Sequence, residues 1–121
     1  MAIDQRIPTD IRIRRASRIL EISYADGSQR ALPFEYLRVY SPSAEVRGHG
    51  AGQAALPTGK RNIQIDAVEP VGRYAIKIRF SDGHDSGLYS WQYLSELAQR
   101  HEELWETYLR QLKEAGGSRD A

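Results

Sequence analysis

The chain has 121 residues, 17 of them basic and 16 acidic, so its net charge of +1 creates no overall field that favours a polyanionic partner. Its 40% hydrophobic and 27% charged residues are typical of one soluble, globular domain with a core of its own. It contains no cysteine, which excludes thiolate catalysis, disulfides, iron–sulfur ligation and cysteine zinc sites.

The start of the chain carries no targeting signal that we recognise. Residues 1–4 show neither a basic region nor the apolar stretch of a secretory signal that would follow it. The longest apolar runs are only a few residues, far short of a membrane span. We therefore expect a cytoplasmic protein with no membrane association.

The first predicted unit is a β-hairpin followed by a short helix. Apolar and polar residues alternate over residues 11–14 and 20–24, which predicts two half-buried strands. Asp26-Gly27 favours a tight hairpin turn, and residues 30–32 form the return strand. Pro33 ends that strand and opens a helix over residues 33–40, which Pro42 terminates.

Residues 43–59 are rich in glycine, proline and small side chains and show no periodicity. They predict a long loop, and such loops in compact domains are usually functional or mobile. After it, residues 61–68 alternate as a strand, and Pro70-Val71-Gly72 predicts a turn into a strand at 74–80.

A second hairpin-plus-helix unit follows. ISYADGSQRALPFEYL (22–37) and IRFSDGHDSGLYSWQYL (78–94) share the order strand, Asp-Gly turn, strand and aromatic-x-Tyr-Leu, with one extra residue in the second. Ser90 is the expected N-cap of the second helix. We interpret the two segments as a pseudo-repeat within one domain, and chance similarity of two ordinary hairpins is the alternative.

The segment from Ser90 to Ala115 has a helical apolar stripe. Two interpretations stay open: the helix breaks near residues 99–101, or it is unbroken and its far turns, with Trp105 and Tyr108, project as a docking surface. The predicted fold is therefore α+β: an antiparallel sheet of hairpins, a short helix after Pro33 and a C-terminal helical segment. The whole chain, 1–121, is one domain, with a core at about 8–100, a helical extension at 101–115 and a flexible tail at 116–121.

Metal binding is the strongest chemical alternative among the side chains. Two histidines with a carboxylate suit iron(II) or zinc. The candidate ligands are His49, His84, Asp82 and Asp85, with Glu45 near them in the sequence. In the simpler interpretation, His84 makes hydrogen bonds within a turn and His49 is exposed to solvent.

Other chemistries find less support in the sequence. No nucleophile elbow surrounds any serine, so Ser41, Ser43, Ser81 and Ser86 are read as turn and cap residues rather than as hydrolase nucleophiles. The glycine-rich residues 48–52 lack the Lys-Ser/Thr of a phosphate-binding loop. The arginines of the N-terminal hairpin suit strand-edge protection better than nucleic-acid binding.

Two segments together, LPFEYLRVYSPSAEVRGHG (32–50) and IDAVEPVGRYAIKIRFSDGHDSGLYSWQYL (65–94), resemble the DUF971 family, also called the gamma-butyrobetaine hydroxylase-like N-terminal domain. The resemblance covers about residues 8–100. In that family the domain occurs alone in bacteria, in front of dioxygenases, and fused to iron–sulfur carrier ATPases. The catalytic iron of the dioxygenases belongs to a separate domain, so the resemblance does not imply that activity here.

The resemblance also implies the place of a zinc site, because the dioxygenases carry three cysteines and a histidine there. In this sequence those positions are Ser41, Ser43, Val46 and His84. Serine hydroxyls are poor zinc ligands and valine is none, so we expect no bound cofactor. We expect hydrogen bonds from Ser41 and Ser43 to replace the metal by capping the end of the preceding helix.

These observations predict a non-catalytic protein-interaction or accessory module whose partner is another protein. The fusion to carrier ATPases links it to iron–sulfur or cofactor-related machinery. The alternative is an iron- or zinc-binding domain that uses His84 and His49 with a nearby carboxylate. The expected interaction surface comprises the 41–59 loop, the 82–86 turn and the C-terminal helix, with the side chains Ser41, Ser43, Glu45, Arg47, Trp105 and Tyr108.

Overall fold

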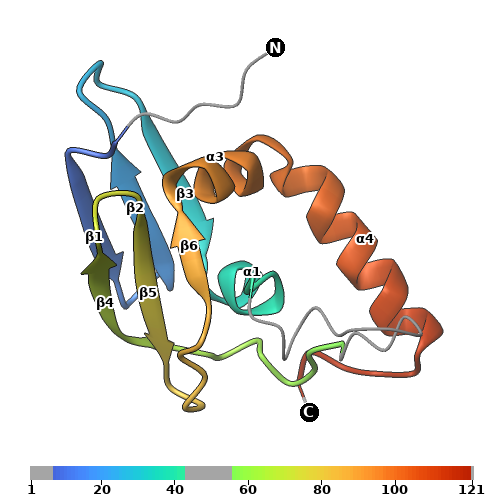
Figure 1. The fold of residues 1–121 in the computed structure, drawn as a ribbon. Coiled ribbons are helices and arrows are strands. Elements are labelled where there is room, and N and C mark those ends of the chain that lie inside the picture. The colour runs from blue at the N-terminus through green and yellow to red at the C-terminus, as the bar shows by residue number, and fades with distance from the viewer. Residues whose placement is uncertain (1–6, 43–55, 121) are drawn as a thin grey trace.

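The computed structural model describes residues 7–42 and 56–120. In these ranges the elements are, in chain order, β1 (Asp10–Arg14), β2 (Ile19–Ser23), β3 (Gln29–Pro33), α1 (Phe34–Val39), β4 (Ile65–Val71), β5 (Ala75–Phe80), β6 (Leu88–Ser90), α3 (Trp91–Gln99) and α4 (His101–Glu114). The strands form two three-stranded antiparallel sheets, β1-β2-β3 and β4-β5-β6. Figure 1 shows both sheets on one side of the molecule and α4 on the other. This confirms the predicted α+β fold.

The first sheet forms where the alternating pattern predicts it. β2 places Leu20 and Ile22 in the core while its other side chains are half-buried. In the antiparallel register Leu20 lies opposite Leu32 and Ile22 opposite Ile11. Since side chains alternate across a strand, one apolar row from each strand is enough to cover one face of the core.

The second sheet corrects one sequence prediction. β4 begins at Ile65 rather than at residue 61 and continues through Pro70 to Val71, so Pro70 lies in a strand and not in the turn. β4 is an edge strand of its sheet, where a residue without a backbone N–H costs no ladder hydrogen bond. The reversal is made by the following residues, with Gly72 at φ 61°.

The pseudo-repeat is a structural one. Gly27 and Gly83 adopt φ values of 89° and 88° in equivalent turns. The aspartates before them, Asp26 and Asp82, each accept the backbone N–H of the second residue after them, at 2.9 and 3.1 Å. The matching backbone angles and hydrogen bonds show that the two turns have the same structure. Chance similarity between two sequence segments would not by itself produce this match.

The two helices that end the repeated units interlock reciprocally. Tyr36, the third residue of α1, donates its hydroxyl hydrogen bond to the carbonyl of Leu97 at 2.7 Å. Tyr93, the third residue of α3, donates to the carbonyl of Tyr40 at 2.6 Å. Tyr36 matches Tyr93 in the alignment, and its continuation matches Tyr40 with Leu97, so the two contacts occupy equivalent places in the two repeated units.

The C-terminal helical segment is broken, as one of the two interpretations predicts. Ser90 caps α3 by accepting the N–H of Tyr93 at 3.0 Å. At Arg100 the backbone leaves the helical region (φ −106°, ψ 23°), and α4 starts at His101. The break turns α4 so that it covers α1 rather than continuing into solvent, as Figure 1 shows.

One apolar core joins both sheets with α1 and α3, and a smaller cluster lies under α4. The small cluster consists of Val39, Tyr108 and Leu112. None of the helices within residues 7–42 and 56–120 has the length and apolar composition needed to span a membrane. The fully buried members of the main core include Leu20, Ile22, Phe34, Tyr36, Leu37, Ile65, Ile78 and Tyr89.

The segment after α4 differs from the flexible tail expected at 116–121. Arg119 makes a bidentate ion pair with Glu35 of α1, at 2.8 and 2.7 Å. Gly59 and Arg61 donate backbone hydrogen bonds to Ser118 and Arg119. These contacts hold residues 118–119 against α1 and the segment that leads to β4.

Candidate functional site

Ser41 and His84 form a buried pair at the end of α1. Ser41 Oγ lies 2.8 Å from His84 Nε2, although the two residues are 43 positions apart in the sequence. Ser41 is 1% exposed and His84 9%. They occupy two of the four positions at which the family resemblance places zinc ligands, so the hydrogen bond, which we call the Ser41–His84 clasp, joins the same two segments. Ser41 thus makes a long-range contact, while Ser43, the other residue expected to cap the helix, lies outside the described residues.

Tyr89 and Gly87 complete the surroundings of the clasp. The hydroxyl of Tyr89 donates to the carbonyl of Leu37 at 2.7 Å. Burial raises the pKa of Tyr89 well above its ordinary value, against the opposing effect of a hydrogen bond with Ser41. A Cβ atom added to Gly87 would overlap Ser41 Oγ and lie 3.2 Å from Pro42 Cδ. Glycine at this position is what lets the two segments approach.

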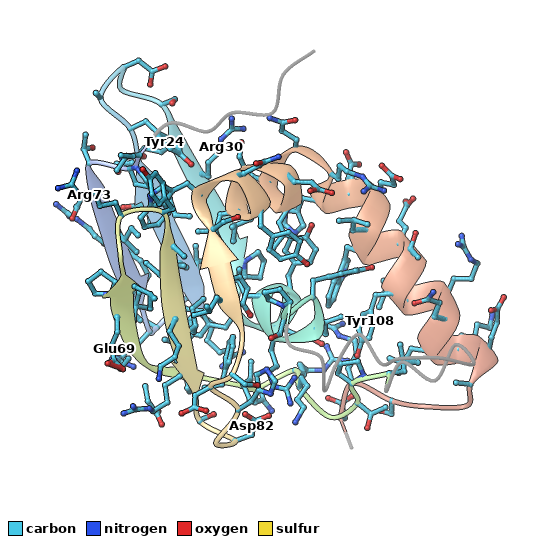
Figure 2. The ribbon with its side chains drawn as sticks, in the orientation of Figure 1. Tyr24, Arg30, Glu69, Arg73, Asp82 and Tyr108 are labelled. Carbon is cyan, nitrogen blue, oxygen red and sulfur yellow. The ribbon has the colours of Figure 1, made fainter. Side chains whose placement is uncertain are left out.

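Asp82 lies beside the clasp, at the tip of the β5–β6 turn (Figure 2). Its Oδ2 accepts hydrogen bonds from Arg38 Nε at 2.9 Å and Lys60 Nζ at 2.6 Å, and its Oδ1 accepts the backbone N–H of His84. Partial burial alone would raise the pKa of Asp82, but these hydrogen bonds outweigh it and lower the pKa to about 2. Asp82 thus ties α1 and Lys60 to the turn.

The predicted metal ligands are not gathered into a site by the described part of the chain. No group of three or more His, Cys, Asp or Glu side chains converges within residues 7–42 and 56–120. Asp82 is engaged by two cations and His84 Nε2 by Ser41. Asp85 follows His84 in the same turn and is half-buried. His49 and Glu45 lie outside the described residues.

The donor set at the family's zinc position does not fit zinc. Ser41 and His84 lie within hydrogen-bonding distance of each other, and a serine hydroxyl is a poor zinc ligand. Ser43 and Val46 lie outside the described ranges, and their side chains offer a neutral hydroxyl and no donor at all. We therefore derive no chemistry through a zinc ion here.

A serine beside a histidine also invites comparison with a hydrolytic dyad. A nucleophile has to reach a substrate carbonyl or phosphorus atom, yet Ser41 is almost completely enclosed. The neighbouring carboxylate of Asp82 accepts the backbone N–H of His84 and the two cations. The enclosed Ser41–His84 pair therefore suits a structural contact better than a catalytic dyad.

Two residues of the expected interaction surface are buried, which corrects that prediction. Tyr108 is 1% exposed, lies between α4 and α1 (Figure 2), and donates its hydroxyl hydrogen bond to the carbonyl of Pro57. Ser41 is buried in the clasp. The apolar stripe of α4 is covered because the break at Arg100 folds it back on α1. Three further residues of that surface, Ser43, Glu45 and Arg47, lie outside the described ranges.

Exposed apolar side chains occur elsewhere, where the sequence patterns gave little signal. Tyr74 is 73% exposed in the β4–β5 turn, and Leu88 is 51% exposed in β6. The sequence pattern predicts Tyr74 within a strand, and alternation in a strand does not reveal which face is covered. In Figure 2 the neighbouring Arg73 and the clasp-associated Asp82 lie at opposite ends of the second sheet.

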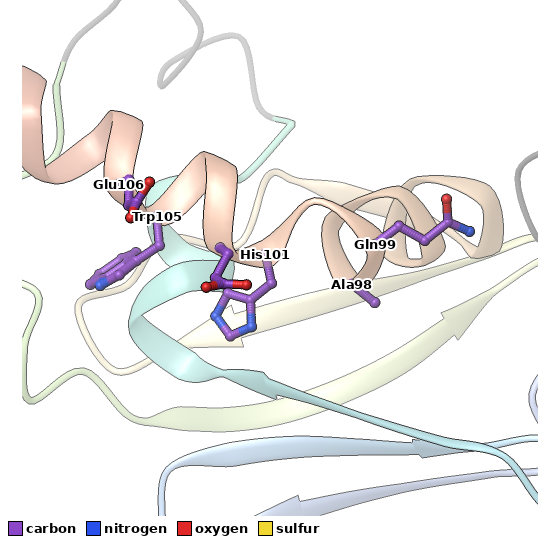
Figure 3. Close-up of a pocket in the computed structure, with 6 residues that line it drawn as sticks. Ala98, Gln99, His101, Trp105 and Glu106 are labelled. Carbon is purple, nitrogen blue, oxygen red and sulfur yellow. The ribbon is translucent and has the colours of Figure 1, made fainter.

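An open hollow of about 450 Å³ lies at the junction of α3 and α4 (Figure 3). The ring of His101 stacks on Tyr36 with a centroid distance of 4.4 Å, which makes it part of the packing between α4 and α1. Burial lowers the pKa of His101, although Glu102 acts in the opposite direction. The hollow is lined by Ala98, Gln99, His101, Glu102, Trp105 and Glu106.

Comparisons with known proteins agree with this description. The family described as gamma-butyrobetaine hydroxylase-like, N-terminal, matches residues 11–95. Two similar solution structures determined by NMR are 50% and 52% identical to the chain, with TM-scores of 0.82 and 0.81. They cover 97% and 96% of this chain, which spans 92% and 86% of theirs.

A crystal structure extends the comparison. It is of a protein of unknown function that belongs to the DUF971 family, from Acidithiobacillus ferrooxidans ATCC 23270. It is 40% identical, with a TM-score of 0.65, and the match covers 78% of this chain and 97% of that one. No curated protein matches the chain.

Proposed function

The chain belongs to the gamma-butyrobetaine hydroxylase-like N-terminal family, also called DUF971, and from this premise we propose that it is a non-catalytic module that binds another protein. The proposal includes a cytoplasmic location and a partner in iron–sulfur or cofactor-related machinery. The family's fusions to iron–sulfur carrier ATPases support that choice of partner.

The Ser41–His84 clasp is the observation that carries the proposal. Two positions that resemble metal ligands of the family are here hydrogen-bonded to each other in the protein interior. A buried hydroxyl and imidazole that satisfy each other stabilise a connection between α1 and the β5–β6 turn. The clasp thereby stabilises the fold, and we assign recognition of the partner protein to the surface of the domain.

Exposed groups supply the surface that such a module needs. Tyr74 and Leu88 present apolar area to solvent, and large exposed apolar side chains are enriched where proteins meet. The hollow at the α3–α4 junction adds aromatic and acidic groups on a different part of the molecule. Leu88 stands on β6 and the hollow is formed by two helices, and regular elements of this kind favour recognition by a preformed surface.

The competing function is iron or zinc binding through His84 and His49 with a nearby carboxylate. It predicts stoichiometric metal in the purified protein. Elemental analysis and titration with iron(II) and zinc, on wild type and His84→Ala, separate the two proposals. Stoichiometric metal that depends on His84 would overturn the interaction-module proposal.

The direct test is affinity capture of a partner from a cytoplasmic extract by the full chain, followed by reconstitution of the purified pair. We expect a saturable complex of fixed stoichiometry. Ser41→Ala, assayed below its unfolding temperature, should keep that affinity because Ser41 is buried away from any partner. Turnover of ester or phosphate substrates that disappears in Ser41→Ala would contradict the proposal and favour a hydrolase.

A further inference from the structure

The hollow at the α3–α4 junction has an electrostatic character that the rest of the helical segment lacks. Glu102 and Glu106 are four residues apart, both exposed, and neither pairs with a cation in the part of the chain that the structure describes. By contrast, Glu96 and Glu103 both pair with Arg100, at 3.4 and 2.8 Å. Two like charges at this spacing repel each other, so a cation between them would stabilise the helix.

Aromatic rings form the rest of the lining. His101 is fixed by its stacking on Tyr36, and Trp105 packs edge-on to the same tyrosine with a centroid distance of 6.2 Å. Figure 3 shows Trp105, Glu106 and His101 around the same opening. Burial lowers the pKa of His101, which favours the neutral ring, and a neutral ring does not repel a cation. Aromatic rings beside carboxylates attract planar cations.

The protein already binds one arginine by this chemistry. The guanidinium carbon of Arg119 lies 5.2 Å from the centre of the Trp105 ring, and the same guanidinium makes its bidentate pair with Glu35. Neither Arg119 nor Glu35 lines the hollow. The hollow thus offers a second combination of Trp105 with carboxylates, in which the cation is not supplied by the described chain.

We propose that this hollow receives an arginine side chain from the partner protein. The inference rests on the proposed interaction function and names the chemistry of one contact. A guanidinium stacks on aromatic rings and bridges two carboxylates with its fork of N–H groups, which a lysine ammonium does not match. A volume of about 450 Å³ accommodates one such side chain and lies within the usual range of about 300–1,000 Å³ for binding pockets.

The test uses the full, isotopically labelled chain and the peptide acetyl-Gly-Arg-Gly-amide, followed by NMR. The indole N–H signals of the two tryptophans provide an internal comparison. Trp105 lines the hollow, whereas Trp91 Nε1 donates a hydrogen bond to the carbonyl of Arg73, away from the hollow. We expect a saturable shift of the Trp105 signal, an unchanged Trp91 signal, and affinity that falls as salt rises. The isosteric citrulline peptide, which is uncharged, should bind at least about tenfold more weakly.

Charge-removing variants locate the effect. Glu102→Gln/Glu106→Gln should weaken binding of the arginine peptide at least about tenfold. The matched control Glu69→Gln/Glu114→Gln changes the net charge equally at positions outside the hollow and should retain wild-type affinity. Equal binding of the citrulline peptide, an equal response of both tryptophans, or insensitivity to the first double variant would each overturn the inference. Equal or tighter binding of the corresponding lysine peptide, acetyl-Gly-Lys-Gly-amide, would also overturn it.

The same variants distinguish this inference from the proposed function. If a captured partner binds Glu102→Gln/Glu106→Gln as tightly as wild type, the arginine contact is wrong while the module proposal stands. If the arginine peptide binds as expected and the full chain captures no protein, the module proposal fails while the chemistry of the hollow stands.

Discussion

The hydrogen bond between Ser41 and His84 links two segments whose side chains could not be paired from sequence spacing. Both groups are buried, so the loss of one leaves the other in a place where water does not easily replace it. The net contribution of such a hydrogen bond to stability is modest. Removing one partner is more costly, because the other polar group then stays buried without a hydrogen bond.

Ser41→Ala should therefore destabilise the protein by about 1–3 kcal/mol, because His84 Nε2 loses this partner in the interior. Urea unfolding of both proteins measures the difference. Ser23→Ala is the matched control, since the Ser23 hydroxyl makes an exposed contact of 3.3 Å with Gln29 and should change stability by less than about 0.5 kcal/mol. Equal losses in both variants would contradict a special role for the clasp.

Asp82 gives a prediction on pH. Its pKa in the folded protein is about 2, below the ordinary value of 3.8, because hydrogen bonds from Lys60, the His84 backbone and Arg38 outweigh burial. The folded state then binds fewer protons than the unfolded state, so this contribution is complete above about pH 4 and is lost as the pH falls toward 2. Because solvent screens this partly exposed carboxylate, its contribution to the free energy of unfolding is about 1–2 kcal/mol.

Asp82→Asn should remove this part of the pH dependence of unfolding between about pH 4 and 2, measured by thermal or urea unfolding at each pH. Asp66→Asn, at an exposed position with no ion pair among the described residues, is the control and should leave the curve unchanged. An unaltered slope in Asp82→Asn would mean that Arg38 and Lys60 do not act on the folded state through this carboxylate.

At the scale of the elements, the repeat explains how two hairpins build one core. Each unit sends a helix from the end of its last strand, and each helix donates a tyrosine hydroxyl to the carbonyl at the equivalent place on the other. The first backbone N–H of each helix also binds an equivalent carbonyl, Phe34 to Arg18 and Trp91 to Tyr74. Such reciprocal contacts fix the helices to each other and to their own sheets.

Tyr36→Phe and Tyr93→Phe should consequently have similar effects. Each substitution removes one hydroxyl from a hydrogen bond of 2.7 or 2.6 Å to a backbone carbonyl, and each should cost about 1–2 kcal/mol of unfolding free energy. Tyr74→Phe provides the control, because Tyr74 is mostly exposed and should lose less than about 0.5 kcal/mol. A large loss in one variant with none in the other would show that the two contacts are not equivalent in energy.

At the scale of the whole molecule, the sequence predicts local structure better than long-range contact. The alternation in β2 and β5 and the turns at Gly27 and Gly83 are local signals, and the structure follows them. Whether Tyr108 is buried or exposed does not depend on local sequence signals. Its position on the apolar stripe of a helix is equally consistent with docking outward or inward, and the break at Arg100 decides between them.

The candidate site shows the same limit. The resemblance to the family directs attention to Ser41 and His84, but their mutual hydrogen bond depends on Gly87 allowing close approach, which no spacing rule states. Among the described residues Glu102 and Glu106 have no ion-pair partner, whereas Glu103 pairs locally with Arg100, three residues before it. Geometry across distant segments has to be known before such residues are recognised.

The last prediction concerns the segment after α4, because residues expected to form a flexible tail make contacts with α1 and with the segment that leads to β4. Arg119 connects the end of the chain to α1 through Glu35, whose side chain is only 8% exposed, and stacks over Trp105. Arg119→Ala leaves the Glu35 carboxylate nearly buried without its counter-charge, so we expect a loss of about 2–3 kcal/mol. We also expect faster amide hydrogen exchange in α4 and a changed Trp105 fluorescence, because both depend on this contact.

Arg61→Ala is the matched control for that substitution. Its ion pair with Asp120 joins side chains that are 43% and 61% exposed, and pairs in such surroundings contribute less than about 1 kcal/mol. Unfolding by urea and hydrogen exchange on both variants compare the buried with the exposed pair in the same segment. If Arg119→Ala unfolds like Arg61→Ala and α4 exchanges as in wild type, the C-terminal segment lies on the surface without holding α4 in place. Its other contacts with α1 then hold it: the cluster of Val39, Tyr108 and Leu112 and the stacking of His101 on Tyr36.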